Sequence, residues 1–364
     1  MTVSDGAWRL LDTGVRPAFE NMALDRTLLE SCQGGAPNTL RFLRFKPSAL
    51  VGYHQSVSQE LDVEFCRAHG IEISRRITGG GALYCDEGQF GWELFVHRRT
   101  FHTADMLAIA REICGVVVEG LRSLRVDAAF RPRNDIEVHG RKIGGTGGAF
   151  DGDALLYQGT VLVDFDIERM LKVLRIPKEK LSDKAISSAR ERITTLRTVL
   201  GTAPDVGLVQ TALVEAFSRC LGVEMRAGDL SAHEGALFRR YCVETASDDW
   251  IFETDRPRLE MAHVSAMRKT AGGLVRVMLA VDRPRGRLKQ AFITGDFFVQ
   301  PKRAIVDLEA ALRDVALERI DAIVAEFFVE RHVEMMLLGP DDLLGVLHEA
   351  LGADGGAGYE RRSV

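Results

Sequence analysis

Two glycine clusters, at 79–81 and 144–148, constrain the fold of this 364-residue chain more than any other feature. The second cluster follows Lys142 in "RKIGGTGG" and leads, after the polar turn "DGD", into the apolar run "ALLYQGTVLVDF" at 154–165. A Rossmann unit requires its glycines between a strand and a helix, and a P-loop requires Gly-Lys-Ser/Thr after its glycines. The second cluster meets neither requirement, because its lysine comes first and a strand follows.

The first cluster lies in "RRITGGGALYCD", where the strand pattern "IEISRR" places Arg75 and Arg76 directly before the glycines. Glycine tolerates positive φ and a close ligand, so successive N–H groups at 79–81 can converge on an anion. A plain turn between strands explains the glycines but not the paired arginines. The stretch alone leaves a turn and an anion-binding loop equally open.

Lys142 is the second candidate, because small residues and the hydroxyl of Thr146 surround it in sequence. Such a lysine suits the stabilisation of a carbonyl oxygen or an α-phosphate on which negative charge builds. Asn134 and Asp135 just before it are, on their own, typical of a turn stabilised by its own side chains. The charged run at 184–196 is, on its own, typical of a solvated face.

Composition excludes several classes of protein. The net charge of −5 argues against a nucleic-acid binder, and no run of about 18 apolar residues could span a membrane. The first residues lack the pattern of a secretory signal, so we expect a cytoplasmic location. The nine histidines form no H-x-x-x-H pair, and no C-x-x-C occurs, so we assign no metal to protein side chains. The six scattered cysteines predict a reduced compartment: Cys32, Cys66, Cys85, Cys114, Cys220 and Cys242.

The chain is too long for one core and predicts two domains. Hydrophobic periodicity predicts helices at 19–31 and 105–124, and a charged helical region at 167–200. The pattern breaks near 246–262, and a hairpin with a D-R-P-R-G turn follows. We therefore expect a catalytic domain at 1–250, a linker at 251–262, a small C-terminal domain at 263–350 and a disordered tail at 351–364.

Together, and in this order, the stretches resemble the two-domain lipoate–protein ligases of the biotin/lipoate ligase superfamily. "RRITGGGALYCD" is similar to that family's lipoate-binding loop, and "RND" with "GRKIGGTGG" to its G-R-N-D and R-K-[IV]-[SG]-G-[ST]-A segments. "YQGTVLV" resembles the H-G-T-L-L strand, and "KAISSARERITTL" the adenylate-binding loop. The resemblance is strong over 8–200, and "LKQAFITGDFF" resembles a strand of the accessory domain.

The resemblance implies a class II biotin/lipoate ligase-like fold: α+β, with mixed and antiparallel sheets, flanking helices and a small α+β accessory domain. It implies that ATP and Mg²⁺ activate lipoate, or a similar acid such as octanoate, to an acyl-AMP. The acyl group then passes to a lysine of a lipoate-accepting protein. That acceptor is a dehydrogenase E2 lipoyl domain, a glycine-cleavage H-type protein or a dedicated lipoate-binding protein. We expect the ligase to act as a monomer.

By motif position, Lys142 is the catalytic residue, and Mg²⁺ would enter with ATP near Asp135. The resemblance places further residues at the ATP and lipoyl-AMP site: Arg75, Arg76, Gly79, Gly80, Gly81, Ala82, Leu83, Asn134, Asp135, Gly145, Thr146, Gln158 and Thr160. Its adenylate-binding loop corresponds to Lys184, Ser188, Arg190 and Arg192.

Three positions depart from the family pattern: Cys85 and Gln158 replace histidines, and Gly147 replaces an alanine. Acyl-chain preference and the geometry of acceptor attack therefore stay open. One alternative is an octanoyltransferase on the same fold, which uses a cysteine in place of ATP. Its nucleophile would lie where this chain has Asn134 and Asp135, and Cys85 is the only cysteine near the loop. A second alternative is a non-catalytic subunit that binds lipoyl carriers, which the retained Lys142 argues against.

Overall fold

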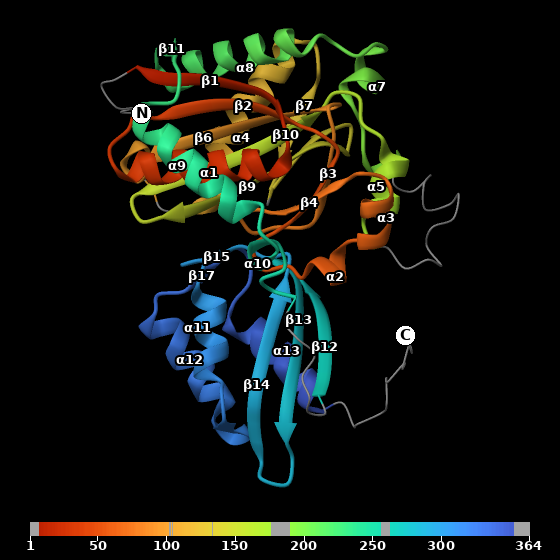
Figure 1. Ribbon diagram of the computed structural model, residues 1–364, viewed down its shortest axis with the longest axis vertical. Helices are drawn as coiled ribbons and strands as arrows, with labels where there is room; N and C mark the ends of the chain where they lie inside the picture. The colour runs from red at the N-terminus through yellow and green to blue at the C-terminus, as the bar shows by residue number, and fades with distance from the viewer. Residues whose placement is uncertain are drawn as a thin grey trace. The chain divides into compact units, whose positions relative to one another are not determined.

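The computed structural model describes residues 7–101, 103, 105–132, 134–175, 190–255 and 263–352. The chain forms two compact units, Met1–Asp255 and Arg256–Val364 (Figure 1). Two residues of the expected adenylate loop, Lys184 and Ser188, lie outside the described residues, as does the expected tail beyond 352. In the described part of the chain, no helix is long and apolar enough to cross a membrane.

An eight-stranded mixed sheet forms the centre of the first unit, in the order β11-β1-β2-β6-β10-β9-β8-β7. β1 pairs in parallel with β2 and β11, and every other neighbouring pair is antiparallel. The strands are β1 Trp8–Arg16, β2 Thr39–Phe45, β6 Gln89–His97, β7 Ala128–Arg131, β8 Asp135–Val138, β9 Arg141–Asp151, β10 Ala154–Leu162 and β11 Met225–Ala227. A smaller sheet, β4-β3-β5, consists of Ser48–Val51 (β3), Glu72–Arg75 (β4) and Leu83–Cys85 (β5).

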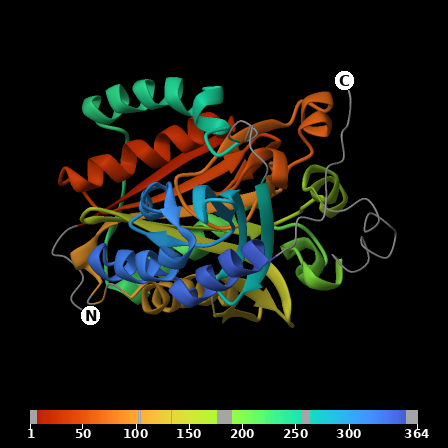
Figure 2. The same ribbon diagram turned by 90° about the horizontal axis from the view of Figure 1, so that it is seen from below.

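Helices cover both faces of the large sheet, as the view in Figure 2 shows. Successive side chains of a strand point to opposite faces. Trp92 and Leu94 of β6 therefore enter one core with the buried faces of α4 and α8, whereas Phe95 enters another with residues of α1. α9 packs on α1. These helices are α1 Ala18–Gln33, α4 Met106–Ser123, α8 Val206–Leu221 and α9 Ala232–Thr245.

The predicted helical region at 167–200 is only partly helical. Its first and last parts form α5 (Ile167–Val173) and α7 (Leu196–Leu200), but Ile193 pairs with Lys142 as a parallel bridge. The other helices whose bounds the structure describes in this unit are short: α2 Val57–Glu60, α3 Val63–Ala68, α10 Asp248–Ile251 and the 3-10 turn Arg98–Thr100.

The second unit is a small α+β domain whose core joins a four-stranded sheet to three helices. The predicted hairpin is β13 and β14, and the sequence analysis missed the strand before it, β12. The sheet consists of β12 His263–Thr270, β13 Gly273–Asp282, β14 Arg287–Gly295 and β16 Val315–Ala316. A second pair is β15 Val299–Gln300 with β17 Glu334–Met335, and the helices are α11 Ala304–Ala311, α12 Ile320–Glu330, α13 Pro340–Gly352 and the 3-10 turn Leu317–Arg319. The α+β class expected for the chain is confirmed.

Candidate active site

The glycine loop, residues 76–82, connects β4 to β5, and Arg75 stands buried at its entrance. The guanidinium of Arg75 donates from Nη1 to the Gln55 carbonyl at 2.7 Å, from Nη2 to the Ile251 carbonyl at 2.8 Å and from Nη2 to Thr254 Oγ1 at 2.8 Å. Its Nε and Nη1 also donate to the carbonyls of Gly52, Tyr53, Trp250 and Ile251. We expected Arg75 to line the ligand pocket, but these contacts make it a structural residue.

Arg76 is also buried, and it holds the glycine loop in shape. Its Nη2 donates to the Gly81 carbonyl at 2.8 Å and to the Gly79 carbonyl at 3.3 Å. In a trans peptide the N–H points opposite to the C=O, so the N–H groups of Gly80 and Ala82 point away from Arg76. Gly80 has a φ of +93°, which a side chain would strain. The loop thus directs two N–H groups away from Arg76, and of these two residues Gly80 is buried and Ala82 is half-buried.

The middle of the loop is tied to the sheet. Gln158 Nε2 on β10 donates to Thr78 Oγ1 at 2.9 Å, and the Thr78 carbonyl accepts from the Tyr53 N–H at 2.9 Å. Ile77 lies in the core with residues of α1. Gln158, predicted from its motif position, therefore contacts the loop directly, while Thr78 was not predicted.

Lys142 lies near the start of β9, with Nζ 2.8 Å from Asp135 Oδ1. Asp135 also accepts a hydrogen bond from Arg131. Burial alone would raise the pKa of Asp135, but the charges and hydrogen bonds of Lys142 and Arg131 outweigh it and lower that pKa. The Lys142 side chain is 35% exposed, so its ammonium group can be reached from solvent.

Several predicted residues share one face of the sheet with the glycine loop. Asp135 is paired with Gly145, whose N–H donates to Thr160 Oγ1 at 3.5 Å. A Cβ added to Gly145 would lie 2.9 Å from Lys142 Nζ, so the ammonium rests over bare backbone. Gln158 follows on the same face of β10, two residues before Thr160. The structure thus brings together Asp135, Lys142, Gly145, Gln158 and Thr160.

The side chain of Thr146 points to the face of the sheet opposite Lys142, contrary to our expectation that it lies at the site. Its Oγ1 lies 3.0 Å from Tyr157 Oη and 3.7 Å from Cys114 Sγ, in the core beneath α4. Its N–H donates to the Asn134 carbonyl at 2.8 Å, which fixes the turn before β8. The hydroxyl of Thr146 therefore lies on the face opposite Lys142, and the role that we expected for Asn134 stays a prediction.

The described part of the adenylate segment runs beside Lys142. Ile193 pairs with Lys142, whose carbonyl accepts from the Thr194 N–H at 2.8 Å. Arg190 forms an exposed ion pair with Glu168 of α5, and the Arg192 side chain is exposed. The two arginines therefore belong to the segment that pairs with Lys142, but their side chains are exposed at the surface.

A protein-built metal site is absent from the described ranges, where no group of three or more His, Cys, Asp or Glu could hold an ion. The carboxylate of Asp135, near which we expected Mg²⁺, already has Lys142 and Arg131 as cationic partners. The residues present do not fit a resident magnesium, so a magnesium ion would enter as part of its ATP complex.

Cys85 is buried at the end of β5 among Met22, Leu43 and Leu50. Burial raises the pKa of its thiol to about 12, although the nearby charge of Arg76 acts in the opposite direction. A thiol is a nucleophile only as its thiolate. Cys85 therefore has neither the access nor the ionisation that covalent catalysis needs.

Comparison with known proteins identifies the family of the chain. The family model of the lipoyl protein ligase A/B catalytic domain matches residues 17–218. A relative from Thermoplasma acidophilum, lipoate-protein ligase A subunit 1, is 30% identical, with 63% of this chain and 90% of the relative aligned. The chain belongs to the lipoyl protein ligase A/B family.

Some relatives of this chain are named octanoyltransferases and not ligases. Octanoyltransferase LipM of Moorella thermoacetica is 29% identical over 67% of this chain and 97% of its own. Among solved structures, a bipartite archaeal ligase from T. acidophilum, studied with its E2 lipoyl domain, has a TM-score of 0.64 at 29% identity (70% and 99% covered). A lipoate-protein ligase A bound with ATP has a TM-score of 0.60 at 27% identity (68% and 99%).

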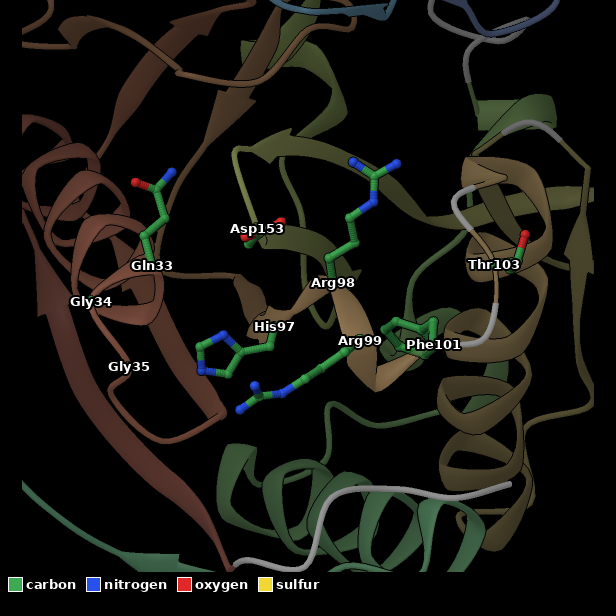
Figure 3. Close-up of a pocket in the computed structure, with 9 residues that line it drawn as sticks. All are labelled: Gln33, Gly34, Gly35, His97, Arg98, Arg99, Phe101, Thr103 and Asp153. Atoms are coloured by element: carbon green, nitrogen blue, oxygen red, sulfur yellow. The ribbon is translucent and has the colours of Figure 1, made fainter.

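A cavity of about 670 Å³ lies at the opposite end of β10 from Thr160 (Figure 3). His97, the last residue of β6, lies on one side of it with Arg98 and Arg99, and the end of α1 forms the other side. Its lining residues are Gln33, Gly34, Gly35, His97, Arg98, Arg99, Phe101, Thr103 and Asp153. It contains none of the predicted site residues, and we do not place the site there.

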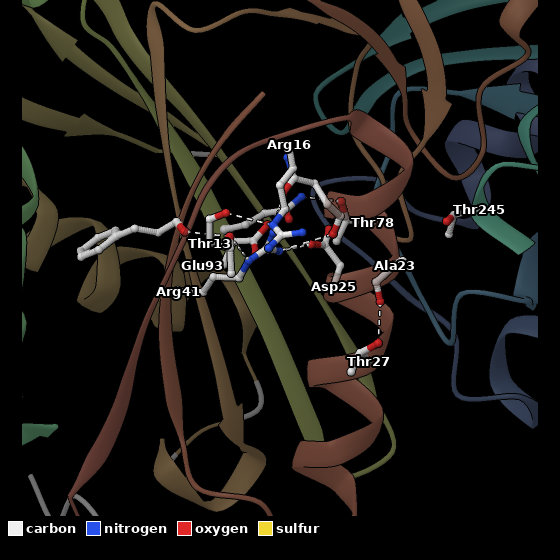
Figure 4. A network of polar contacts seen from close by, with 12 residues as sticks. Thr13, Arg16, Ala23, Asp25, Thr27, Arg41, Thr78, Glu93 and Thr245 are labelled. Atoms are coloured by element: carbon white, nitrogen blue, oxygen red, sulfur yellow. Dashed lines mark hydrogen bonds and ion pairs between the residues drawn. The ribbon is translucent and has the colours of Figure 1, made fainter. Parts of the chain in front are cut away.

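The sequence analysis also missed a buried charge cluster next to the glycine loop (Figure 4). Arg41 of β2 contacts Asp25 of α1 and Glu93 of β6, and all three are buried. A signal was available, since "TLRFLRF" and "FGWELFV" each place charge inside an apolar strand. Such opposite charges in two buried strands require a partner, and β2 and β6 are neighbours.

Proposed function

We propose that this family member is an ATP-dependent lipoate–protein ligase. It activates the carboxylate of lipoate, or of a similar medium-chain acid such as octanoate, to an acyl-AMP. It then transfers the acyl group to a lysine of a lipoate-accepting protein. The observation that carries the proposal is the reachable ammonium of Lys142, which lies over Gly145 on the face shared with the glycine loop.

Lys142 suits both steps of this reaction. In the first, a carboxylate oxygen bonds to the α-phosphorus of ATP and the bond to pyrophosphate breaks. In the second, the acceptor amine bonds to the acyl carbon, loses a proton, and AMP leaves. Negative charge builds on oxygen each time, and a positioned cation stabilises it by about 3–4 kcal/mol. Asp135 holds the ammonium in place through the 2.8 Å contact.

The glycine loop suits the anionic part of the substrate, because Arg76 holds two of its carbonyls and the opposite N–H groups point away from this cation. The half-buried Ala82 and Leu83 at its end suit the aliphatic tail, each CH₂ of which gains about 0.8 kcal/mol on burial. The similar ligase with bound ATP and the similar ligase studied with a lipoyl domain support ATP as substrate and a lipoyl domain as acceptor.

An octanoyltransferase is the second candidate, because relatives of this name are 29% identical. That reaction transfers the acyl group through a cysteine thioester. Among the described cysteines, Cys220 and Cys242 are partly exposed, on α8 and α9, and the other four are buried. Cys114, which contacts Thr146, lies on the face opposite Lys142, and Cys85 is buried beside the glycine loop. This arrangement favours the ligase.

Release of pyrophosphate tests the proposal. The purified protein is given lipoate and Mg–ATP without any acceptor, and pyrophosphate and lipoyl-AMP are measured by coupled assay and mass spectrometry. A ligase forms both at once. If neither forms, while an octanoyl thioester is transferred without ATP and an octanoylated cysteine peptide is found, the octanoyltransferase is the correct assignment.

A further inference from the structure

Arg131, the last residue of β7, contacts two acids of the neighbouring strand β8. Its Nη2 donates a hydrogen bond to Asp135 Oδ2, and its Nε lies 3.6 Å from Glu137 Oε2. Side chains two residues apart on a strand lie on the same face of the sheet, so the two carboxylates share one face of β8. β7 is the edge strand of the large sheet, and Arg131 approaches the acids from this edge.

Lys142 approaches the same acids from the other side of β8, because β9 is the next strand of the sheet. Its Nζ lies 2.8 Å from Asp135 Oδ1. In the register of the two strands, however, the residue directly opposite Lys142 is Glu137, and Asp135 is opposite Gly145. Directly opposite residues have Cβ atoms about 4.5–5.5 Å apart, which is close enough for an ion pair. Lys142 therefore pairs with the diagonal acid, although another acid lies directly opposite.

The contacts of Arg131 account for this arrangement. Asp135 lies between the two cations and gives one oxygen to each, Oδ2 to Arg131 and Oδ1 to Lys142. The Glu137 carboxylate is turned toward Arg131 and hence toward β7, away from the strand that carries Lys142. Without Arg131, Glu137 would lose its partner on that side, and its carboxylate could turn to the ammonium directly opposite.

The choice of acid decides where the ammonium lies. At Asp135 it rests over Gly145, where an added Cβ would lie 2.9 Å from Nζ. Glu137 is two residues further along β8, which is about 7 Å of strand. An ammonium drawn to Glu137 would therefore move away from Gly145 and from Thr160, whose hydroxyl accepts the Gly145 N–H.

An ion pair that closes a hairpin is the ordinary explanation for Arg131 and Asp135, which flank the turn between β7 and β8. That explanation covers neither the contact with Glu137 nor the diagonal position of Lys142. The Arg131 side chain is also 55% exposed, and exposed ion pairs contribute little to stability. Stability alone therefore does not account for Arg131.

We propose that Arg131 is a positioning residue, which holds Glu137 on the β7 side and thereby keeps the Lys142 ammonium on Asp135, over Gly145. The inference rests on the proposed function in one respect, since it takes Lys142 as the cation that stabilises the charge built up in the reaction. Where the ammonium lies is a separate question, which can be answered without an activity assay.

The kinetic test compares Arg131→Gln with the double variant Arg131→Gln/Glu137→Gln. The control is Arg122→Gln, which removes a similarly exposed ion pair with Glu119 on α4. Pyrophosphate release gives kcat and the KM values for lipoate and ATP, and urea unfolding gives the stability of each variant.

Arg131→Gln should lower kcat about five- to tenfold with little change in either KM, because a misplaced cation costs transition-state stabilisation and not ground-state binding. The double variant should recover to within about twofold of the wild type, since the competing acid is gone and the two substitutions are coupled. A merely structural role would change the unfolding midpoint without this recovery of kcat. Arg122→Gln should behave as the wild type.

Crystal structures of the wild type and of Arg131→Gln locate the ammonium directly. We expect Lys142 Nζ within hydrogen-bond distance of Asp135 in the wild type and of Glu137 in the variant. Wild-type kcat in Arg131→Gln, a double variant no faster than Arg131→Gln, or an ammonium that stays on Asp135 in Arg131→Gln would each overturn the proposal. Failure of the proposed function looks different, because then the wild type itself releases no pyrophosphate, while the crystal structures still decide what Arg131 does.

Discussion

The arginine pair and Lys142 are two cationic regions beside glycines, and they differ in burial and in hydrogen-bond partners. Arg75 and Arg76 are buried, and their guanidinium groups donate mainly to main-chain carbonyls of the protein. Lys142 is 35% exposed and has one carboxylate partner, Asp135. A cation beside glycine therefore binds a ligand only if its donors are not already used inside the fold.

The chemistry of the two side chains explains the division. A guanidinium presents five donors in a rigid fork, so it can satisfy several carbonyls of irregular backbone at once. An ammonium is a compact point charge on a flexible stem, and it can follow charge as it develops on a substrate. In the site that we propose, the arginines shape the loop and the lysine is the group that would face the reaction.

Replacing Lys142 tests the reactive half of the comparison and should have the largest effect. Lys142→Ala should reduce pyrophosphate release about 10²–10³-fold or more, because a cation that stabilises the transition state is lost. The midpoint of urea unfolding should change little, since partly exposed ion pairs contribute at most about 1 kcal/mol. Near-normal pyrophosphate release by the folded variant would remove Lys142 from the mechanism.

Replacing Arg75 tests the structural half. Arg75→Lys keeps the charge but leaves buried carbonyls around Ile251 and Gln55 without donors, at about 1–3 kcal/mol each. We expect a loss of about 3 kcal/mol in the free energy of unfolding, measured in urea, and a smaller change in the KM for lipoate. Arg240→Lys, at an exposed position, is the matched control. A variant of full stability with a greatly raised KM would show that Arg75 binds substrate after all.

Moving the ammonium without removing it sharpens the comparison. Gly145→Ala would place a methyl group 2.9 Å from Lys142 Nζ, so the side chain must shift. Activity should fall about tenfold, since small misplacements of a catalytic group are costly. Gly115→Ala, in the middle of α4 with no atom within 4 Å of the new methyl group, should leave activity unchanged. Equal activity of both variants would mean that the resting position of Lys142 is not the reactive one.

The smallest effect is expected at Cys85. Cys85→Ala should keep pyrophosphate release and acyl transfer within about twofold, because a buried thiol with a pKa of about 12 carries no catalytic charge. Activity is compared per folded molecule, because the substitution leaves a small cavity in the core. If the variant loses acyl transfer, and mass spectrometry finds an acyl group on Cys85 of the wild type, the reaction proceeds through the thiol of Cys85 and not through Lys142.

The family resemblance predicted the α+β class, and the apolar run at 154–165 predicted the strand β10. They could not predict which way the side chains of β9 point. The register shifts between Ile136 and Glu137, so Ile143 is an extra residue and Lys142 comes to share a face with Gly145. Without this bulge, residues three apart would lie on opposite faces. Thr146 is turned away by the same shift, which no composition rule reveals.

The hydrogen-bonding role of Arg75 inside the fold could not be predicted for another reason. Its partners at Trp250, Ile251 and Thr254 lie 175 to 179 residues further along the chain. A local motif can show that an arginine precedes glycines. It cannot show that carbonyls far along the chain accept the hydrogen bonds of this arginine in the folded protein. The contrast with Lys142 is therefore one of long-range topology, and only the folded chain displays it.

The distance in sequence between Arg75 and its partners has a consequence for folding during synthesis on the ribosome. At about 5–20 residues per second, synthesis of the 176 residues between Arg75 and Ile251 takes roughly 10–35 s. During this time the strands and α1 can already assemble, while the arginine at the entrance of the loop still lacks its last partners. The nascent chain should therefore be able to pair β1 to β10 before Arg75 gains its last partners, and a chain released before Ile251 should lack them.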